Sequence, residues 1–232
     1  MNNKLHSQLL VRGGMEIRAV IFDFDGVIAE TEHIHIQAEK QTMLKYGVKI
    51  SEDELHEFTG TTARYMFTEL LSRYGLSTTY DEIFNEKDKT MFKLLESDVQ
   101  PTRGVIELLW RLKKKNMKLG IGSSSHRKLI TYVLKRLEIE NLFEAVIGAE
   151  DITYGKPNPE IFLKCARMLG ADPAQCLVVE DAALGLQAAK AAGMICLGYR
   201  NPHSGKQDLA KADFVTDDFT KLDIEKLVLY RK

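Results

Sequence analysis

The sequence lacks the hallmarks of a membrane protein, a disulfide-rich secreted protein and a nucleic-acid-binding protein. None of its apolar runs approaches the roughly 18 residues that a membrane-spanning helix needs. Its three cysteines are an odd number without CxxC spacing, which argues against a disulfide framework or a zinc site. Lys and Arg total 32, Asp and Glu total 33, and the formal net charge is −1, so no basic excess favours a nucleic-acid partner.

What remains fits a globular protein of the cytoplasm. The 232 residues are 44% hydrophobic and 28% charged, which is typical of such proteins. The cysteines sit in apolar stretches, as small buried side chains in a reducing compartment do. Residues 1–14 contain no stretch long enough for a secretory signal and are expected to form an N-terminal extension. We expect no nucleic-acid or membrane partner, and a monomer or a small homo-oligomer.

The first strong structural signal is a continuous apolar run over 18–22, which predicts a strand buried on both faces of a parallel sheet. After Pro101 the pattern alternates between helices and short strands. The further strands are expected over 118–122, 143–147, 176–179, 194–199 and 214–215. Such alternation predicts an α/β fold with a doubly wound, Rossmann-like parallel sheet and right-handed crossovers.

Between the first strand and Pro101 the pattern differs. No comparable strand occurs from Thr31 to about Leu95, and apolar residues recur at helical spacing in three stretches. Ser51 with Glu54, and Thr61 or Thr62, are plausible helix N-caps. The sequence therefore predicts an all-helical insert in the α/β core.

Polar residues collect where four of the predicted strands end. In an open α/β sheet, ligands bind beyond the carboxyl ends of the strands, so these residues are expected to converge on one place. They are Asp23 and Asp25 after the first strand, Ser123 and Ser124 after the second, Lys156 in the loop after the third, and Glu180 and Asp181 at the fourth.

The chemistry of this set points to phosphoryl transfer. Four carboxylates in one cavity cannot all stay ionised without a cation, and carboxylates with a backbone carbonyl are ligands that Mg²⁺ prefers. Lys156 and the Ser123 hydroxyl add positive charge and hydrogen-bond donors, which suit a phosphoryl group. A spare Asp can then act as a nucleophile that forms an aspartyl-phosphate, and Asp25 can act as general acid and then base.

Four motifs, in this order along the chain, resemble those of the haloacid dehalogenase-like hydrolases. They are 23–27, Ser123 after an apolar strand, 155–159 and 179–185, and the resemblance runs from about Ile17 to the C-terminus. The helical insert resembles the small helical cap of that family. The resemblance implies a core domain over 15–29 and 101–232 and a cap domain over 30–100.

The resemblance also implies roles for the strand-end residues. Asp23 would be the nucleophile and a Mg²⁺ ligand, and Asp25 the acid/base and a ligand through its backbone carbonyl. Asp181 would be a metal ligand, and Glu180 a ligand or a supporting acid behind the metal. Ser123, Ser124 and Lys156 would bind phosphate. Because Asp25 is present, the dehalogenase and phosphonatase branches of the family are disfavoured, which leaves a phosphatase or a phosphomutase.

Among subgroups, the sequence is most similar to the β-phosphoglucomutase-like set, which includes many small phosphatases. Thr31 and His35 match its hinge and proton-handling positions, and Gly60 with Thr61 resembles its specificity loop. The candidate cap-side substrate contacts are Thr31, Glu32, His35, Gly60, Thr61 and Arg64.

Two departures from the mutase pattern favour a phosphatase. The mutase has Arg three residues after the specificity-loop Gly, where this chain has Ala63, and Arg64 follows one position later. One step along a helix rotates a side chain by about 100°. The mutase also has Lys-Asn where this chain has His126 and Arg127. We therefore expect a phosphatase of a small phosphomonoester, with a phosphomutase as the alternative and a non-catalytic phospho-ligand binder as a third reading.

Overall fold

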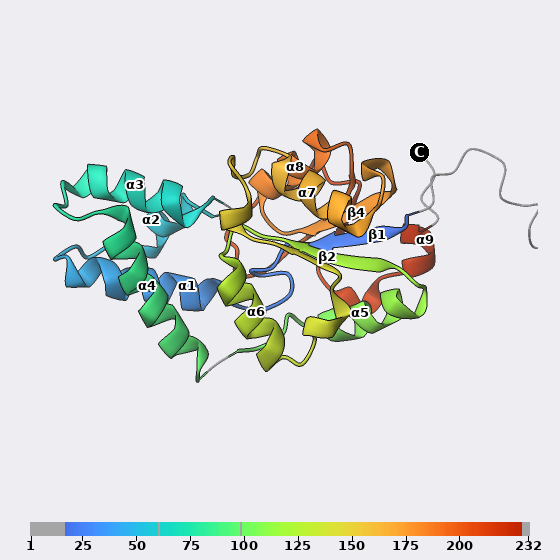
Figure 1. Cartoon of the computed structure of the whole chain (residues 1–232), viewed down its shortest axis with the longest axis horizontal. Helices are drawn as coiled ribbons and strands as arrows, with labels where there is room; N and C mark the ends of the chain where they lie inside the picture. The colour runs from blue at the N-terminus through green and yellow to red at the C-terminus, as the bar shows by residue number, and fades with distance from the viewer. Residues whose placement is uncertain (1–16, 60, 98, 229–232) are drawn as a thin grey trace, which may run out of the picture.

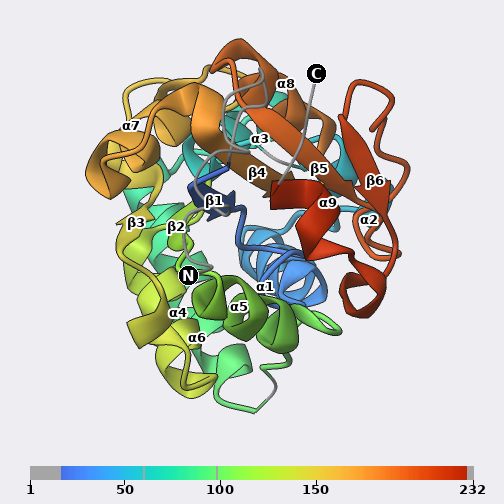
Figure 2. The same ribbon diagram turned by 90° about the vertical axis from the view of Figure 1, so that its right-hand side faces the viewer.

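The centre of the structure is one parallel β-sheet, as the sequence predicts. The computed structural model describes residues 17–59, 61–97 and 99–228. The strands are β1 (Ala19–Phe22), β2 (Lys118–Gly122), β3 (Ala145–Ile147), β4 (Cys176–Glu180), β5 (Ile195–Tyr199) and β6 (Phe214–Thr216). In this part of the chain they pair in parallel in the order β3-β2-β1-β4-β5-β6. Figure 2 shows them side by side, with β6 at one edge.

Helices cover both faces of the sheet. On one face lie α7 (Glu160–Leu169) and α8 (Ala183–Ala191), and on the other α5 (Val105–Lys114) and α6 (Arg127–Arg136), as Figure 1 shows. The short helix α9 (Ile224–Val228) packs on the same face of the sheet as α5. The 3₁₀ helices are η1 (Glu140–Leu142), η2 (Ala149–Asp151), η3 (Pro173–Gln175) and η4 (Phe219–Lys221).

The side chains of β1 explain its continuous apolar run. Successive residues of a strand point to opposite faces of the sheet. Val20 and Phe22 pack into the apolar cluster under α5 and α6, whereas Ala19 and Ile21 pack into the cluster under α7 and α8. The strand is therefore buried on both faces and has no solvent-facing position for a polar residue.

The segment between β1 and α5 is all-helical, and with the sheet it confirms the predicted fold class. Its helices are α1 (Glu32–Lys45), α2 (Glu52–His56), α3 (Ala63–Tyr74) and α4 (Tyr80–Leu95), which we call the cap. Ser51 caps α2 and Thr62, not Thr61, caps α3, and each side chain accepts a hydrogen bond from the backbone N–H three residues on. The cap has an apolar cluster of its own around Phe67 and Leu70. None of the helices described is long and apolar enough to cross a membrane.

The cap joins the core through two adjacent stretches of chain. The Glu30 N–H donates to the Gln100 carbonyl at 2.9 Å, and the Thr102 N–H donates to the Ile28 carbonyl at 3.1 Å. The base of the cap also packs on the core, because Ile34 of α1 belongs to the same apolar cluster as the α5 face of the sheet. The domain boundaries at 29/30 and 100/101 stay a prediction, and the expected extension over 1–14 lies outside the described residues.

Three strands begin later than predicted: β1 and β5 by one residue each and β3 by two. The strand expected over 143–147 begins at Ala145, because the chain first turns through η1, and pairing with β2 starts at the register Ala145 with Gly120. The apolar residues Leu142 and Phe143 extend the hydrophobic pattern beyond the hydrogen-bonded strand, since both pack against the core from the turn.

The cap core can be tested by a matched pair of leucines. Leu70 is fully buried (0% exposed), whereas Leu44 is 63% exposed. Leu70→Ala should lower the free energy of unfolding by about 2–5 kcal/mol because it leaves a cavity. Leu44→Ala should change it by no more than about 0.5 kcal/mol. Urea unfolding followed by circular dichroism measures both, and equal effects would contradict a packed core in the cap.

Candidate active site

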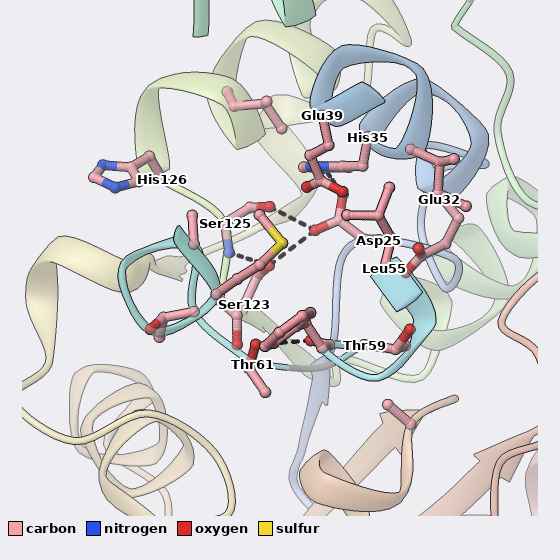
Figure 3. A pocket seen from close by; sticks show the side chains of 18 of the residues that line it. Asp25, Glu32, His35, Glu39, Leu55, Thr59, Thr61, Ser123, Ser125 and His126 are labelled. Atoms are coloured by element: carbon pink, nitrogen blue, oxygen red, sulfur yellow. Dashed lines mark hydrogen bonds and ion pairs between the residues drawn. The ribbon is translucent and has the colours of Figure 1, made fainter. Parts of the chain in front are cut away.

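A cavity of about 950 Å³, including its open mouth, lies between the cap and the carboxyl ends of the strands. It opens beside β1 and β4, where the strand order reverses, which is the usual ligand position in doubly wound sheets. Residues of α1, α4 and the 123–126 loop line it together with Lys156 and Asp181. Figure 3 shows Glu32, His35 and Glu39 reaching it from the cap, opposite Ser123 and Ser125.

A buried ion-pair triad forms the floor of the site. Asp23 directly follows β1, and its N–H donates to the Val179 carbonyl of β4 at 2.9 Å. The Lys156 ammonium donates to Asp23 Oδ1 at 2.8 Å and to Glu180 Oε1 at 2.5 Å. The Lys156 side chain is 1% exposed and that of Glu180 is 0% exposed. Burial lowers the pKa of Lys156, but the two carboxylates outweigh it and hold the pKa above its ordinary value, so the lysine is charged.

Asp181 lies beside this triad, and within the described residues its side chain accepts hydrogen bonds from uncharged donors. Ser204 Oγ and Asn201 Nδ2 donate to its Oδ2, and the same Asn201 amide donates to the Gly26 carbonyl at 3.0 Å. Gly26 has φ +75°, and a Cβ there would clash with Asn201 and Asp181. The residue after Asp25 must therefore be glycine for both reasons.

The acidic cluster fits a divalent metal ion. One carboxylate oxygen each from Asp23, Glu180 and Asp181 can be chosen so that all lie within 4.8 Å of one another. When ionised, the three carboxylates together with the Lys156 ammonium carry a net charge of −2. One divalent cation would balance that charge. Burial raises the pKa of Asp23 to about 7, and the neighbouring Glu180 and Asp25 add to the rise while Lys156 opposes it. Burial and the charges of Glu180 and Asp23 likewise raise the pKa of Asp181.

The Asp25 side chain points away from the acidic cluster of Asp23, Glu180 and Asp181 and toward hydrogen-bond donors. Its Oδ1 accepts from Thr31 Oγ1 at 2.5 Å and contacts His35 Nε2 at 3.0 Å, and its Oδ2 accepts from Ser125 Oγ at 2.6 Å (Figure 3). Burial raises the pKa of Asp25, but His35 and the hydrogen bonds from Ser125 and Thr31 outweigh it and hold the pKa well below its ordinary value. Asp25 is therefore ionised in this arrangement.

A buried lysine of the cap fixes the orientation of His35. Lys87 of α4 is 5% exposed, and its ammonium lies 2.9 Å from His35 Nδ1. An ammonium only donates, so Nδ1 accepts, and the ring proton on Nε2 donates to Asp25. One continuous chain of hydrogen bonds therefore links α4, α1 and the loop after β1.

The structure brings most of the predicted site residues together. The residues that line the cavity are Asp23, Asp25, Glu32, His35, Thr61, Ser123, Ser124, Lys156 and Asp181. Glu180 lies beneath them, bonded to Lys156 and, at 2.8 Å, to the Ala182 N–H. Thr31 is buried behind the cavity and reaches it through Asp25.

Arg64 is not brought into the cavity. Its side chain is 70% exposed, and its guanidinium stacks on the Tyr80 ring with 4.1 Å to the centroid. The preceding residue, Ala63, faces the cavity instead, because adjacent helical positions differ by about 100°. Gly60 lies outside the described residues.

Three cavity residues were missed from the sequence. Ser125 belongs to the serine run that was noticed, and it donates to Asp25 Oδ2 at 2.6 Å, a shorter hydrogen bond than the 3.4 Å one from Ser123. Glu39 and Lys87 belong to helices rich in charged residues. In the sequence, such residues are typical of a solvent-exposed helix face. The available signal for Glu39 was its spacing of four residues from His35, which places both on one face of α1.

Known proteins are similar to this chain in sequence and in fold. The family model of haloacid dehalogenase-like hydrolases matches residues 20–199. A β-phosphoglucomutase of Bacillus subtilis (strain 168) is 33% identical over 220 residues, which are 91% of this chain and 94% of that protein. A fructose-1-phosphate phosphatase of Escherichia coli (strain K12) is 30% identical over 182 residues, 78% of this chain and 95% of that protein. The crystal structure of a β-phosphoglucomutase from Clostridium difficile has a TM-score of 0.81 at 30% identity and covers 91% of this chain and 95% of its own.

The buried triad can be tested against a surface ion pair. In the metal-free protein near neutral pH, Lys156→Met should lower the free energy of unfolding by about 3–5 kcal/mol, because it leaves Asp23 and Glu180 buried without a cation. Lys128→Met is the matched control, since Lys128 pairs with Asp88 with its side chain 74% exposed and should lose no more than about 1 kcal/mol. Denaturant unfolding with a chelator present gives both values. Similar small losses would contradict the triad.

Proposed function

The chain belongs to the haloacid dehalogenase-like hydrolase family, and from this we propose that it is a Mg²⁺-dependent phosphatase of a small phosphorylated metabolite, a sugar phosphate or a similar phosphomonoester. One observation carries the proposal: the Asp23 carboxylate and the Lys156 ammonium meet in a cavity that Asp25 also lines. A nucleophile, a phosphate-binding cation and an acid/base thus share one small space. The similarity to a fructose-1-phosphate phosphatase supports the reaction class.

Asp23 is the proposed nucleophile. One oxygen of its carboxylate forms a bond to phosphorus, and the bond between phosphorus and the leaving-group oxygen breaks. Ser123, Ser124 and Lys156 bind the phosphoryl oxygens, and the charge of Lys156 stabilises the negative charge of the transition state. The products of this step are an aspartyl-phosphate on Asp23 and an alcohol.

Asp25 is the proposed acid and base. Asp25, ionised in the free protein, must first take up a proton from solvent or from the incoming phosphomonoester, and it then gives that proton to the leaving-group oxygen. Its ionised form, which Thr31, His35 and Ser125 stabilise, then takes a proton from a water molecule. The oxygen of that water bonds to phosphorus, the bond to Asp23 breaks, and inorganic phosphate leaves.

Asp23, Asp181 and the backbone carbonyl of Asp25 would hold the Mg²⁺ ion, which favours hard oxygen ligands. When bound, the ion supplies positive charge that balances the phosphoryl oxygens and the acids. Glu180 already accepts hydrogen bonds from Lys156 and the Ala182 N–H. We assign to Glu180 the role of orienting the Lys156 ammonium.

The cap-side residues would contact the leaving group. Glu32, His35 and Thr61 line the cavity from the cap, whereas Arg64 faces solvent. The cavity lies between cap and core and suits a small molecule rather than a polymer. Closure of the cap over it would exclude bulk water during the reaction.

A phosphomutase is the second candidate, favoured by the similarity to β-phosphoglucomutase over 91% of the chain. A mutase must also hold the second phosphate of a bisphosphate intermediate, which calls for a cation at the far end of the cavity. Arg64 stacks outside it, and Arg127 pairs with Asp151 at 3.2 Å. This arrangement favours the phosphatase.

Asp23→Asn tests the nucleophile. The variant should fold normally and lose at least about 10³-fold in phosphate release from p-nitrophenyl phosphate with Mg²⁺, because an amide oxygen cannot form the phosphoenzyme. Asp81→Asn is the matched control, since Asp81 is a cap residue whose side chain is 82% exposed, and it should retain full turnover.

Unchanged turnover in Asp23→Asn would contradict the assignment. The wild-type protein also separates the alternatives when it is given β-glucose 1-phosphate. A phosphatase releases inorganic phosphate, whereas a mutase accumulates glucose 6-phosphate with little free phosphate. A non-catalytic binder shows no metal-stimulated turnover of any substrate.

Mg²⁺ binding should depend on pH with a definite sign. Because the pKa of Asp23 is raised to about 7, this carboxyl is protonated in the metal-free protein below that pH. The raised pKa stabilises the folded state at low pH, and that contribution is lost as the pH rises toward 7. Metal must displace the proton from Asp23, and Asp181, whose pKa is also raised, adds to the effect, so Mg²⁺ affinity should rise with pH through about 7.

Calorimetric titration of the chelator-treated protein with Mg²⁺, in two buffers of different ionisation enthalpy, measures affinity and proton release together. We expect proton release below pH 7 that fades above it. Affinity that is the same at about pH 5.5 and about pH 8, without proton release, would contradict a raised pKa at the metal site.

A further inference from the structure

The cap side of the cavity carries charged groups that the proposed chemistry does not use. Glu39 and Glu32 line it from α1, and Lys87 lines it from α4 (Figure 3 for the two acids). Glu39 is only 8% exposed and Lys87 only 5% exposed. Buried ionisable groups are rare unless paired, so their position calls for an explanation.

Glu39 has unused hydrogen-bonding capacity. Its carboxylate makes no hydrogen bond or ion pair with any residue in the described part of the chain, although it faces the cavity. Burial raises the pKa of Glu39, and the nearby charges of Lys87 and His35 only partly oppose it. An acceptor left without a donor in such a place destabilises the folded protein unless a ligand or water completes it.

Lys87 is the complementary group. Its ammonium has three N–H bonds, and among the described residues it donates one hydrogen bond, to His35 Nδ1. A free acceptor and free donors therefore face the same part of the cavity. A hydroxyl group both donates and accepts, so this combination suits the hydroxyls of a sugar or polyol better than an apolar group.

The same groups disfavour a second anion. Glu32 and Glu39 both line this part of the cavity, so carboxyl oxygens surround any group bound here. The Arg64 guanidinium, which could have balanced an anion, stacks on Tyr80 outside the cavity. A phosphate or carboxylate placed here would lie beside the carboxyl oxygens of two acids, with the remaining N–H donors of Lys87 to offset them.

We propose that Glu39 is a specificity-determining residue whose carboxylate, with the Lys87 ammonium beside it, binds hydroxyl groups of an uncharged leaving group and excludes anionic ones. The inference rests on the proposed function, because it takes the phosphate of the substrate to lie at Asp23 and Lys156. It narrows the substrate class to monophosphates of uncharged, hydroxyl-bearing molecules.

Two substrates with the same phosphorylated carbon test this inference. Glucose 6-phosphate has an uncharged, hydroxyl-bearing leaving group, whereas 6-phosphogluconate carries a carboxylate at its far end. We expect wild-type kcat/KM to favour glucose 6-phosphate by at least about tenfold, the worth of one hydrogen bond to a charged group. In Glu39→Gln this preference should shrink by about tenfold, because glutamine keeps the shape but presents amide N–H donors to an anion where the carboxyl presented acceptor oxygens.

Matched variants keep the result interpretable. Glu69→Gln makes the same change at an exposed position of α3 outside the cavity and should keep the wild-type preference. Glu39→Asp retains the charge and should keep discrimination against 6-phosphogluconate even if turnover of both sugars falls. It also serves if Glu39→Gln does not fold.

The outcomes separate the two proposals. If wild type hydrolyses p-nitrophenyl phosphate but does not prefer glucose 6-phosphate, or if the preference is the same in Glu39→Gln, the assignment of Glu39 is overturned while the phosphatase stands. If wild type releases no phosphate from p-nitrophenyl phosphate with Mg²⁺, the proposed function itself fails.

Discussion

The site depends on one lysine that holds acids together below the sheet edge. Without Lys156, Asp23 and Glu180 could not lie together in so buried a place, because buried charges are tolerated only when paired. The packing around the triad is tight. A Cβ in place of the Gly185 hydrogen would clash with the Glu180 carboxylate, so α8 can approach the end of β4 only with glycine at this position. The residual negative charge, with Asp181 beside it, is what makes the place suited to a divalent cation.

Asp23 and Asp25 show how two carboxyls two residues apart acquire opposite properties. The side chain of Asp23 points to other acids and into a buried floor, so its pKa rises. The side chain of Asp25 points the other way, to a hydroxyl and an imidazole carried by the start of the cap and to the hydroxyl of Ser125, so its pKa falls. In the metal-free protein Asp23 therefore needs a cation to stay ionised, whereas the donors around Asp25 already hold it in its ionised form.

Sequence reasoning placed the core residues of the site because topology alone decides them. Asp23, Ser123, Lys156 and Asp181 follow different strands of one parallel sheet, and parallel strands end at the same edge. The cap was harder, since a helix can turn any face to the core. Arg64 was expected in the cavity and faces solvent, whereas Glu39 and Lys87 looked like solvent-exposed charges and are buried. The fall of the Asp25 pKa depends on contacts from three separate segments, which no spacing in the sequence reveals.

The insertion of the cap directly after β1 also bears on how the chain reaches its fold. Ala19 pairs with Lys118 on one side and with Cys176 on the other, so the central strand finds both partners only across long stretches of chain. The cap helices close shorter stretches of chain: α3 packs on the next helix, α4, and α1 packs on α4 across α2 and α3 alone. Because loop-closure entropy delays distant pairings more than local ones, the cap can condense early while β1 waits for the strands that complete the sheet.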